Sequence, residues 1–365
     1  MKKYLVLSLL AFASYKTIAQ ERAITTAVPF MSIAADPRAA AMGDQGVATS
    51  VDAYSQQWNP AKYAFAEAKQ GVGLTYTPYL SKLVNDVFSG NITYFNRLNE
   101  RSALGASLRY FSNGEIELRE SFDSTPMIVK PNELAIDVSY SLKLSEDFAL
   151  AIAGRFINSD LKLQTSFDDA SAASSLGVDI AGYYQSPIQI HDGFEGRWRA
   201  GFNISNIGPK LKYDDRTDGA FLPTNLGLGV GYDFIFDLHN KLGVNLEFNK
   251  LLVPTPPAMT DDPIENAELR RKYNDTGWFS GMCKAFGDQP DGFSEMMREV
   301  TWAWGAEYWY DDVFALRAGY FNEHEDKGAR KFFSLGAGLK YTTINLDVSY
   351  LFSTSGVNNP IEGTL

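Results

Sequence analysis

The sequence has little of three things on which many proteins depend: cysteine, histidine and long apolar runs. Its single cysteine, Cys283, excludes an internal disulfide among the 365 residues. Only three histidines are present, whereas a hydrolase usually sets such a base beside its nucleophile. After the N-terminus, no stretch approaches the ~20 consecutive apolar residues of a membrane-spanning helix. A membrane protein made from this chain would therefore have to be a closed barrel.

Positive charge is also in short supply. The chain has 33 Lys and Arg residues against 44 Asp and Glu residues, which gives a net charge of −11 at pH 7. Nucleic-acid-binding domains are usually basic, so nucleic acid is excluded as an expected partner. The paired acids, such as Asp311-Asp312, lie in expected turns without the oxygen spacing of a calcium loop. We expect neither a metal site nor a cofactor.

The N-terminus has the pattern of an export signal. Met1-Lys2-Lys3 is basic, Tyr4 to Ala13 is a short apolar stretch, and Thr17-Ile18-Ala19 is a small-residue cleavage site. The sequence therefore predicts a Sec signal peptide over residues 1–19 and a mature chain that begins at Gln20.

The rest of the chain is dominated by alternation of apolar and polar residues. From Leu134 to Leu142 every even position is large and apolar, and every odd position is small or polar. The same pattern returns over 242–249 and 344–352. Such segments are strands with one apolar and one polar face.

Thirteen strands are predicted in this way, and the connections between them alternate between long and short. The candidates span residues 70–77, 86–97, 102–112, 132–145, 147–160, 175–186, 197–207, 224–237, 240–250, 301–311, 313–322, 331–342 and 343–353. Alternating loop lengths are typical of outer-membrane barrels, which have short periplasmic turns, long external loops and usually an even strand number. We expect an all-β, antiparallel transmembrane barrel of about 14 strands over residues 70–365, with a further strand after Pro360 that continues beyond Leu365.

Glycines recur on the predicted lumen-facing positions, where lipid-facing Leu, Trp, Tyr and Phe residues alternate with them. They are Gly105, Gly227, Gly229, Gly231 and Gly319. Glycine within a strand often marks the close approach of another backbone, so we expect a segment to pack against the inner wall.

That segment is expected to be residues 20–69, which lack alternation and are rich in small residues. The residues assigned to this plug are Asp36, Pro37, Arg38, Gly43, Trp58, Asn59 and Pro60. A disordered periplasmic tail is the alternative, but Trp58, Tyr54 and Met42 oppose it because disordered segments are poor in large apolar residues.

At these motifs the chain resembles a known family. The run from Asp36 to Gly43, with 46–49 and 58–61, is similar to the N-terminal region of FadL-like outer-membrane barrels. Segments 110–116, 131–137, 305–310, 317–321 and 336–341 resemble the PorV family, the FadL-like barrels of the Bacteroidetes type IX secretion system. The resemblance implies an outer-membrane shuttle or adaptor that is not an enzyme. Its implied partners are the large translocon barrel, cargo with a C-terminal signal domain, the surface sortase, and outer-membrane lipid or lipopolysaccharide.

The long insertion over 251–300 fits such a role, because loops of this length are usually functional. Its large apolar residues recur at roughly helical spacing, and we predict that they bind a partner. They are Trp278, Phe279, Met282, Phe286, Phe293, Met296 and Met297. The alternative is a lid that packs on its own barrel, and the two can hold together.

Two rival functions stay open. A FadL-type transporter of hydrophobic solutes would need an apolar lumenal pocket, for which the inward positions are too polar unless the plug supplies it. A lipopolysaccharide-modifying hydrolase would need a catalytic base, but His191, His239 and His324 all lie in expected turns or loops.

Overall fold

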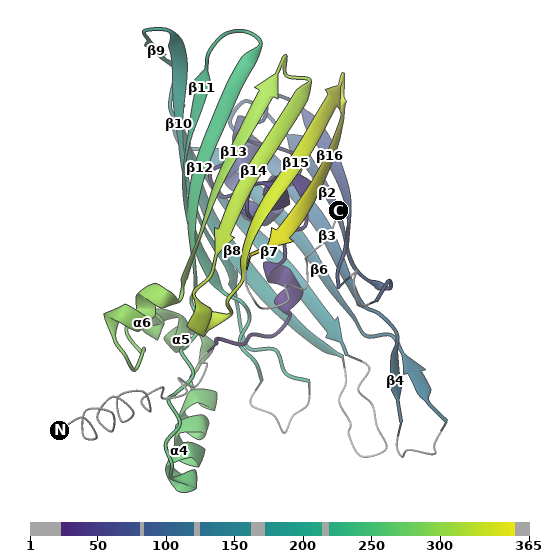
Figure 1. The fold of residues 1–365 in the computed structure, drawn as a ribbon, viewed down its shortest axis with the longest axis vertical. Helices are drawn as coiled ribbons and strands as arrows, with labels where there is room; N and C mark the ends of the chain where they lie inside the picture. Colours follow the sequence, from purple (N-terminus) through teal and green to yellow (C-terminus); the bar gives the residue numbers. More distant parts are fainter. Residues whose placement is uncertain (1–22, 81–83, 120–124, 162–171, 214–218, 355–365) are drawn as a thin grey trace, which may run out of the picture.

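The computed structural model of the chain is a tall, curved wall of tilted strands that surrounds the N-terminal segment (Figure 1). It describes residues 23–80, 84–119, 125–161, 172–213 and 219–354. The predicted signal peptide and the expected strand after Pro360 lie outside this part of the chain.

The wall consists of long antiparallel strands that pair in sequence order. They are β1 (Gln70–Pro78), β2 (Val87–Arg97), β3 (Ser102–Asn113), β6 (Asn132–Lys143), β7 (Phe148–Asp160), β8 (Ala173–Gln185), β10 (Phe194–Ile207), β11 (Asn225–Ile235), β12 (Asn240–Leu251), β13 (Val300–Tyr310), β14 (Phe314–Asn322), β15 (Lys331–Tyr341) and β16 (Ile344–Ser353). Each coincides with one predicted strand, and the predicted antiparallel barrel architecture is confirmed.

The described sheet has a fourteenth strand that the sequence did not predict, in addition to the untested strand expected after Pro360. This fourteenth strand is the short β9 (Gln189–His191), which pairs with the start of β10. β1 and β16 stand at the two ends of the hydrogen-bonded order within the described sheet.

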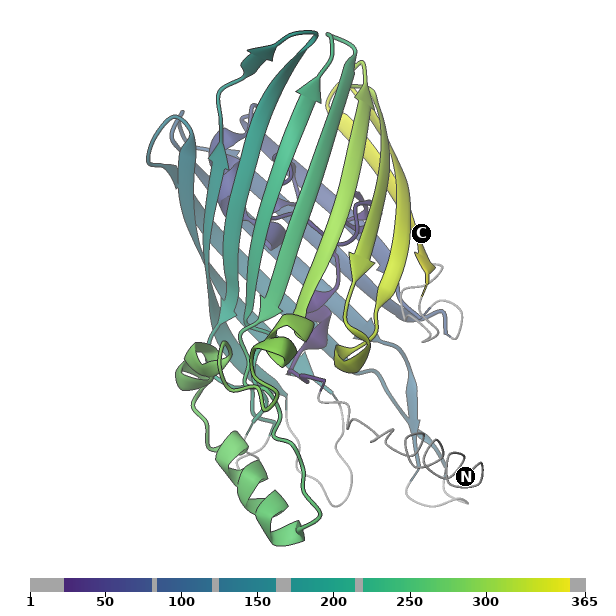
Figure 2. The ribbon, with the colours of Figure 1, turned by 60° about the vertical axis from the view of Figure 1, so that its left-hand side comes forward.

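The two ends of the barrel differ as the loop lengths predict (Figures 1 and 2). One end has tight turns, such as Asp311-Asp312, where both residues have positive φ (56° and 53°), as hairpin turns require. The other end carries the long connections. They contain the ribbon β4 (Ile116–Leu118) and β5 (Met127–Val129), the helices α4 (Pro263–Asn274), α5 (Trp278–Lys284) and α6 (Phe293–Arg298), and η3 (Glu325–Lys327).

The strands bury one face and expose the other, as their alternation predicts. On β3, Leu108 is 40% exposed on the outer face, while Arg109 is 3% exposed on the inner face. Aromatic residues gather toward both ends of the outer face, for example Trp302 and Tyr310 on β13. Eight residues of tilted strand separate these two side chains by about 20 Å, close to the height of the apolar band of an outer-membrane barrel.

The N-terminal segment lies inside the wall. It contains η1 (Pro29–Ser32), α2 (Pro37–Ala41), α3 (Ser55–Trp58) and η2 (Pro60–Phe65). Two of these turns start with the same device: Asp36 caps α2 through Ala39 N–H (2.8 Å), Asn59 caps η2 through Ala61 N–H (3.1 Å), and a proline follows each cap. Local chemistry thus explains the Asp-Pro and Asn-Pro pairs of the plug.

The lumen-facing glycines pack against this segment. A methyl group at Gly229 would lie 2.8 Å from Cβ of Ala48, and one at Gly319 would overlap the backbone of Met42. Asn59 Nδ2 also donates to the carbonyl of Gly182 on β8 (2.9 Å). The prediction that inward glycines make room for another segment is therefore confirmed at Gly229 and Gly319.

Gly319→Val should displace the plug and lower the free energy of unfolding by about 1–3 kcal/mol, because the backbone of Met42 has no room to retreat. Urea unfolding in detergent micelles measures this change. Gly90→Val is the matched control, because nothing lies within 4 Å of a methyl group at that position. Equal stability of the two variants would contradict tight packing of the plug.

Candidate functional site

A chain of alternating charges ties the plug to the wall. Arg38 of α2 donates from Nε and Nη2 to the two carboxylate oxygens of Glu307 on β13 (2.9 and 2.6 Å), and from Nη1 to Asp52 Oδ2 (2.8 Å). Glu307 also accepts from Nε of Arg317 (2.7 Å), and Arg317 Nη1 donates to Asp347 Oδ1 on β16 (2.6 Å). Both arginines and Glu307 are buried. The plug is therefore held by bidentate, charge-assisted bonds rather than by apolar contact alone.

A second set of contacts holds residues 46–48. Glu247 of β12 is buried and accepts backbone N–H bonds from Gly46 (2.9 Å) and Val47 (2.8 Å) through Oε2. Arg199 of β10 donates from Nη1 to the carbonyl of Ala48 (2.8 Å). This backbone recognition explains why a motif of small residues occurs here, since bulkier side chains would keep the backbone away from the wall.

The lumen at the long-loop end is filled by the protein's own apolar residues. Val28 and Phe30 are each 1% exposed, and they pack with Phe111, Leu211 and Leu222 from the wall and loops. The rings of Phe30 and Phe111 are stacked with centroids 5.9 Å apart. The apolar part of the lumen is thus occupied by the N-terminal segment.

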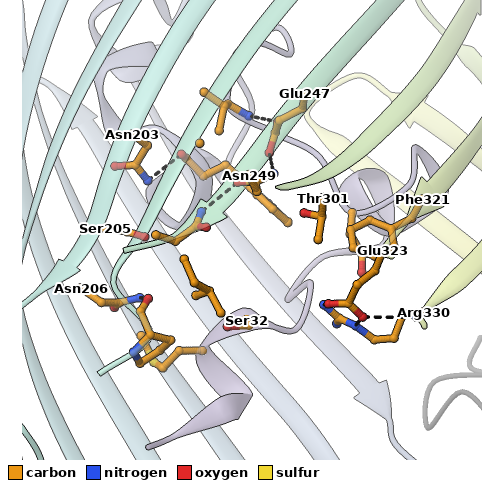
Figure 3. A pocket seen from close by; sticks show the side chains of 18 of the residues that line it. Ser32, Asn203, Ser205, Asn206, Glu247, Asn249, Thr301, Phe321, Glu323 and Arg330 are labelled. Atoms are coloured by element: carbon orange, nitrogen blue, oxygen red, sulfur yellow. Dashed lines mark hydrogen bonds and ion pairs between the residues drawn. The ribbon is translucent and has the colours of Figure 1, made fainter. Parts of the chain in front are cut away.

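A cavity between the N-terminal segment and the wall has a mixed polar and apolar lining (Figure 3). It has a volume of about 180 Å³, and Asn203, Asn249, Glu247, Glu323 and Arg330 are among its lining residues. Ligand pockets usually measure about 300–1,000 Å³ and are mainly apolar. This cavity is therefore smaller than the pocket expected for a hydrophobic solute, and charged and amide side chains form part of its lining.

The 251–300 insertion is anchored at the barrel mouth by a cluster of buried charges. Lys250 Nζ, at the end of β12, lies 2.7 Å from Oε2 of Glu299. Lys327 Nζ of η3 reaches Glu299 Oε1 (3.0 Å) and Glu295 Oε1 (2.7 Å), and Glu295 belongs to α6. These contacts fix α6 against η3 and against the end of β12.

The predicted partner-binding residues lie on the surface of this anchored insertion. Phe293 is 73% exposed, Phe279 60%, Phe286 50% and Trp278 37%. Met297 is exposed as well, whereas Met282 and Met296 are half-buried. α5 packs inward through Gly281, where a methyl group would lie 3.1 Å from the ring of Phe221 in the β10–β11 connection. The insertion therefore packs on its own barrel and still presents aromatic side chains outward.

The structure keeps the three histidines apart from one another. His191 Nε2 lies 3.1 Å from the hydroxyl of Tyr232, His239 pairs with Asp311 in exposed turns, and His324 Nδ1 lies 3.5 Å from Asp326. In the part of the chain that the structure describes, no three His, Cys, Asp or Glu residues cluster as a metal site would require. Cys283 is exposed.

The described helices include none that is long and apolar enough to span a bilayer.

Sequence reasoning missed several functional features. Glu307, Arg317 and Glu247 were not singled out as plug contacts, although each occupies an inward position of a predicted strand. A charge on the polar face of a barrel strand was the available signal. The helix α4 was missed because it has no buried residue and hence no apolar face to detect.

Acid should release the insertion from the barrel. Burial alone would raise the pKa of Glu299, but hydrogen bonds and charge from Lys250, then Lys327, lower it below the ordinary value of 4.5. A lowered folded pKa stabilises the docked state fully above 4.5, and this stabilisation is lost as the pH falls through the folded pKa. Limited proteolysis of residues 251–299 should therefore accelerate as the pH falls through the folded pKa of Glu299. In Glu299→Gln the acid-induced increase in the proteolysis rate should be smaller. An unchanged increase would contradict the role of Glu299 in holding the insertion.

Comparison with known proteins places this geometry in a family. The chain matches the family described as "Type IX secretion system protein PorV" over residues 16–258, which is well over half of its length. No curated protein matches it.

Several solved structures have a similar fold. The "TodX deltaS2S3 mutant monoaromatic hydrocarbon channel" has 12% identity and a TM-score of 0.50, with 89% of this chain and 94% of that chain covered. The Pseudomonas putida toluene transporter TodX has 13% identity and a TM-score of 0.46, with coverage of 85% and 91%. A Pseudomonas aeruginosa FadL homologue has 12% identity and a TM-score of 0.41, with coverage of 90% and 93%. Together with the family match over its plug and most of its strands, this fold shows that the chain belongs to the PorV family of FadL-like outer-membrane barrels of the type IX secretion system.

Proposed function

We propose that this protein is a shuttle or adaptor of type IX secretion, which binds cargo at the translocon and delivers it to the attachment machinery on the cell surface. Family membership makes it an outer-membrane component of the secretion system. The proposed steps are binding of cargo through a C-terminal signal domain, contact with the large translocon barrel, and delivery to a surface sortase.

The observation that carries the proposal is the anchored insertion with its outward aromatic residues. Buried charges fix its base through Glu299 and Lys327, so its surface is pre-organised. Aromatic and Met residues are enriched at interface cores, and Phe279 and Phe293 are among the most exposed on the insertion. We infer that the residues predicted above form the partner surface at the long-loop end, which faces outward in barrels of this class.

The plug favours the function of an adaptor over that of a pore. Residues 20–69 are proposed as a stable hatch, after removal of residues 1–19 as a signal peptide, because Arg38 and Glu307 join the segment to the wall. Such a hatch would leave the barrel to act through its outer surfaces. Outer-membrane lipid or lipopolysaccharide would then contact the apolar band and the mouth.

Transport of a hydrophobic solute is the second candidate, which the fold of its structural neighbours favours. The occupied apolar lumen opposes it, because Val28 and Phe30 fill the space that a solute would need. A lipopolysaccharide-modifying hydrolase has less support, since the described structure pairs His191 of β9 with Tyr232, His239 with Asp311 and His324 with Asp326 rather than with a Ser or Cys nucleophile.

Depletion of the protein from living cells tests the proposal. Proteins with a C-terminal signal domain should then accumulate without attachment to the surface, while the rate of hydrophobic-solute uptake stays the same. Normal surface attachment with slowed solute uptake would support the transporter instead.

A further inference from the structure

The short-turn end of the barrel carries an apolar tip that the proposed function does not use. The two most exposed large apolar side chains of the described chain are Leu238 (87%) and Ile190 (84%). Leu238 lies in the β11–β12 turn, and Ile190 lies in β9, so neither belongs to the lipid-facing face of a long strand. Ile188 (51%) lies two residues before Ile190 and adds to this tip, while Phe236 (47%) lies beside it on the outer face.

Ile190 and Leu238 belong to neighbouring hairpins at the highest part of the wall. Ile190 pairs with Glu195 of β10, and Glu195 pairs with Ile235 of β11, so two strand spacings, about 10 Å, separate the β9 hairpin from β11. Figures 1 and 2 both show β9 and the tops of β10 to β12 beyond the turns of β13 to β16. The tip therefore projects past the neighbouring turns.

Aromatic rings beside the tip continue the girdle on the outer face of the barrel, whereas Ile190 lies on the opposite face of the sheet with Glu195 and Ile235. The ring of Phe194 contacts those of His191 (4.9 Å between centroids) and Phe234 (5.6 Å), and Phe234 contacts Phe236 (6.2 Å). Phe194 lies four residues beyond Trp198, which places it about 10 Å closer to the turns. Exposed apolar surface thus extends from the membrane interface into the aqueous phase.

The rim of the tip is acidic. Asp192, Glu195 and Asp237 are exposed, and none of them forms an ion pair within the described ranges. The nearby bases are already used: Arg197 pairs with Asp233 (3.2 Å), and Lys241 pairs with Asp312 (2.6 Å). An acidic rim disfavours contact with anionic lipid headgroups and favours a basic partner.

We propose that this tip, formed by Ile188, Ile190 and Leu238 and rimmed by acids, docks a basic amphipathic segment of another protein. Short turns of outer-membrane barrels face the periplasm, so the partner would be periplasmic. Its apolar side would cover Ile190 and Leu238, and its Lys or Arg residues would meet Asp192 and Glu195. Exposed apolar patches rimmed by polar residues are typical of interaction sites.

A defined peptide tests this proposal on the full chain in zwitterionic nanodiscs. The probe is a fluorescent amphipathic helix of Leu and Lys, compared with its Leu and Glu counterpart and with empty nanodiscs. Fluorescence anisotropy should show binding of the basic peptide only. Both Ile190→Ser/Leu238→Ser and Asp192→Lys/Glu195→Lys should weaken it about tenfold.

The control variant is Leu98→Ser/Leu144→Ser, which removes exposed apolar side chains (51% and 52%) from two other short turns and should bind normally. Equal binding by all variants, or equal binding of both peptides, would overturn the proposal. So would photo-crosslinks from position 190 in cells that reach lipid only. Variants of the 251–300 aromatics should keep peptide binding, so failure of the proposed function would be recognised separately.

Discussion

Glu307→Ala should lower the free energy of unfolding by about 3–5 kcal/mol, because it leaves two buried arginines without their shared carboxylate. Arg38 and Arg317 both bond Glu307, and all three side chains are buried. The loss should free the plug as well, since Arg38 is its charged link to β13. Urea unfolding in detergent micelles measures the first effect, and protease cleavage within residues 23–69 measures the second.

An exposed ion pair supplies the control for this variant. Lys241 pairs with Asp312 at a short turn, and Lys241→Ala, which leaves the turn residue Asp312 in place, should cost only about 0.2–1 kcal/mol. Glu307→Gln keeps the shape but not the charge and should fall between the two. A plug that stays protease-resistant and fully stable in Glu307→Ala would show that the charged chain does not hold it.

Replacing Trp278, Phe279, Phe286 and Phe293 by Ser should weaken binding of cargo or translocon roughly 100-fold, because aromatic anchors dominate interface energies. The barrel itself should keep its free energy of unfolding within about 0.5 kcal/mol, since these side chains are largely exposed. Pull-down with a cargo C-terminal signal domain and with isolated translocon measures the loss. In cells, type IX substrates should accumulate unattached.

Other exposed apolar residues at the same end provide the matched control. Ile116 and Ile128 of the β4–β5 ribbon are 38% and 58% exposed, and their replacement by Ser should leave partner binding unchanged. If the aromatic variant binds its partners normally and loses uptake of a hydrophobic solute, the transporter function is correct.

The strands were predictable because lipid on one face and the lumen on the other impose a period of two along each of them. Leu108 and Arg109 illustrate this, since Leu108 lies on the outer face of the barrel and the adjacent Arg109 lies on the lumenal face. The register between neighbouring strands then follows from the same pattern, because a slip of one residue would turn every apolar side chain inward.

The turns of the N-terminal segment were predictable, but its contacts with the wall were not. Local capping predicts the turns that begin at Asp36-Pro37 and at Asn59-Pro60, because a capping residue followed by proline is visible in the sequence. The partner of Arg38 lies 269 residues away, and no local rule selects Glu307 among the inward carboxylates. The path of Val28 and Phe30 to the long-loop end likewise depends on packing with distant wall residues.

Short and fully exposed elements escaped prediction for a different reason. β9 has three residues, too few for an alternation to be seen. α4 carries start signals, since Asp262 caps Ile264 N–H (2.8 Å) and Pro263 follows, yet it buries no residue. Capping alone could have found this helix, whereas hydrophobic periodicity could not.

Affinity isolation of the full chain from native outer membranes tests the adaptor function most directly. We expect a very large translocon barrel and proteins with a C-terminal signal domain to co-purify with it. They should be lost when Trp278, Phe279, Phe286 and Phe293 are replaced by Ser and retained when Ile116 and Ile128 are replaced. Isolation of the barrel without translocon and without cargo, under conditions that preserve other outer-membrane complexes, would contradict the account.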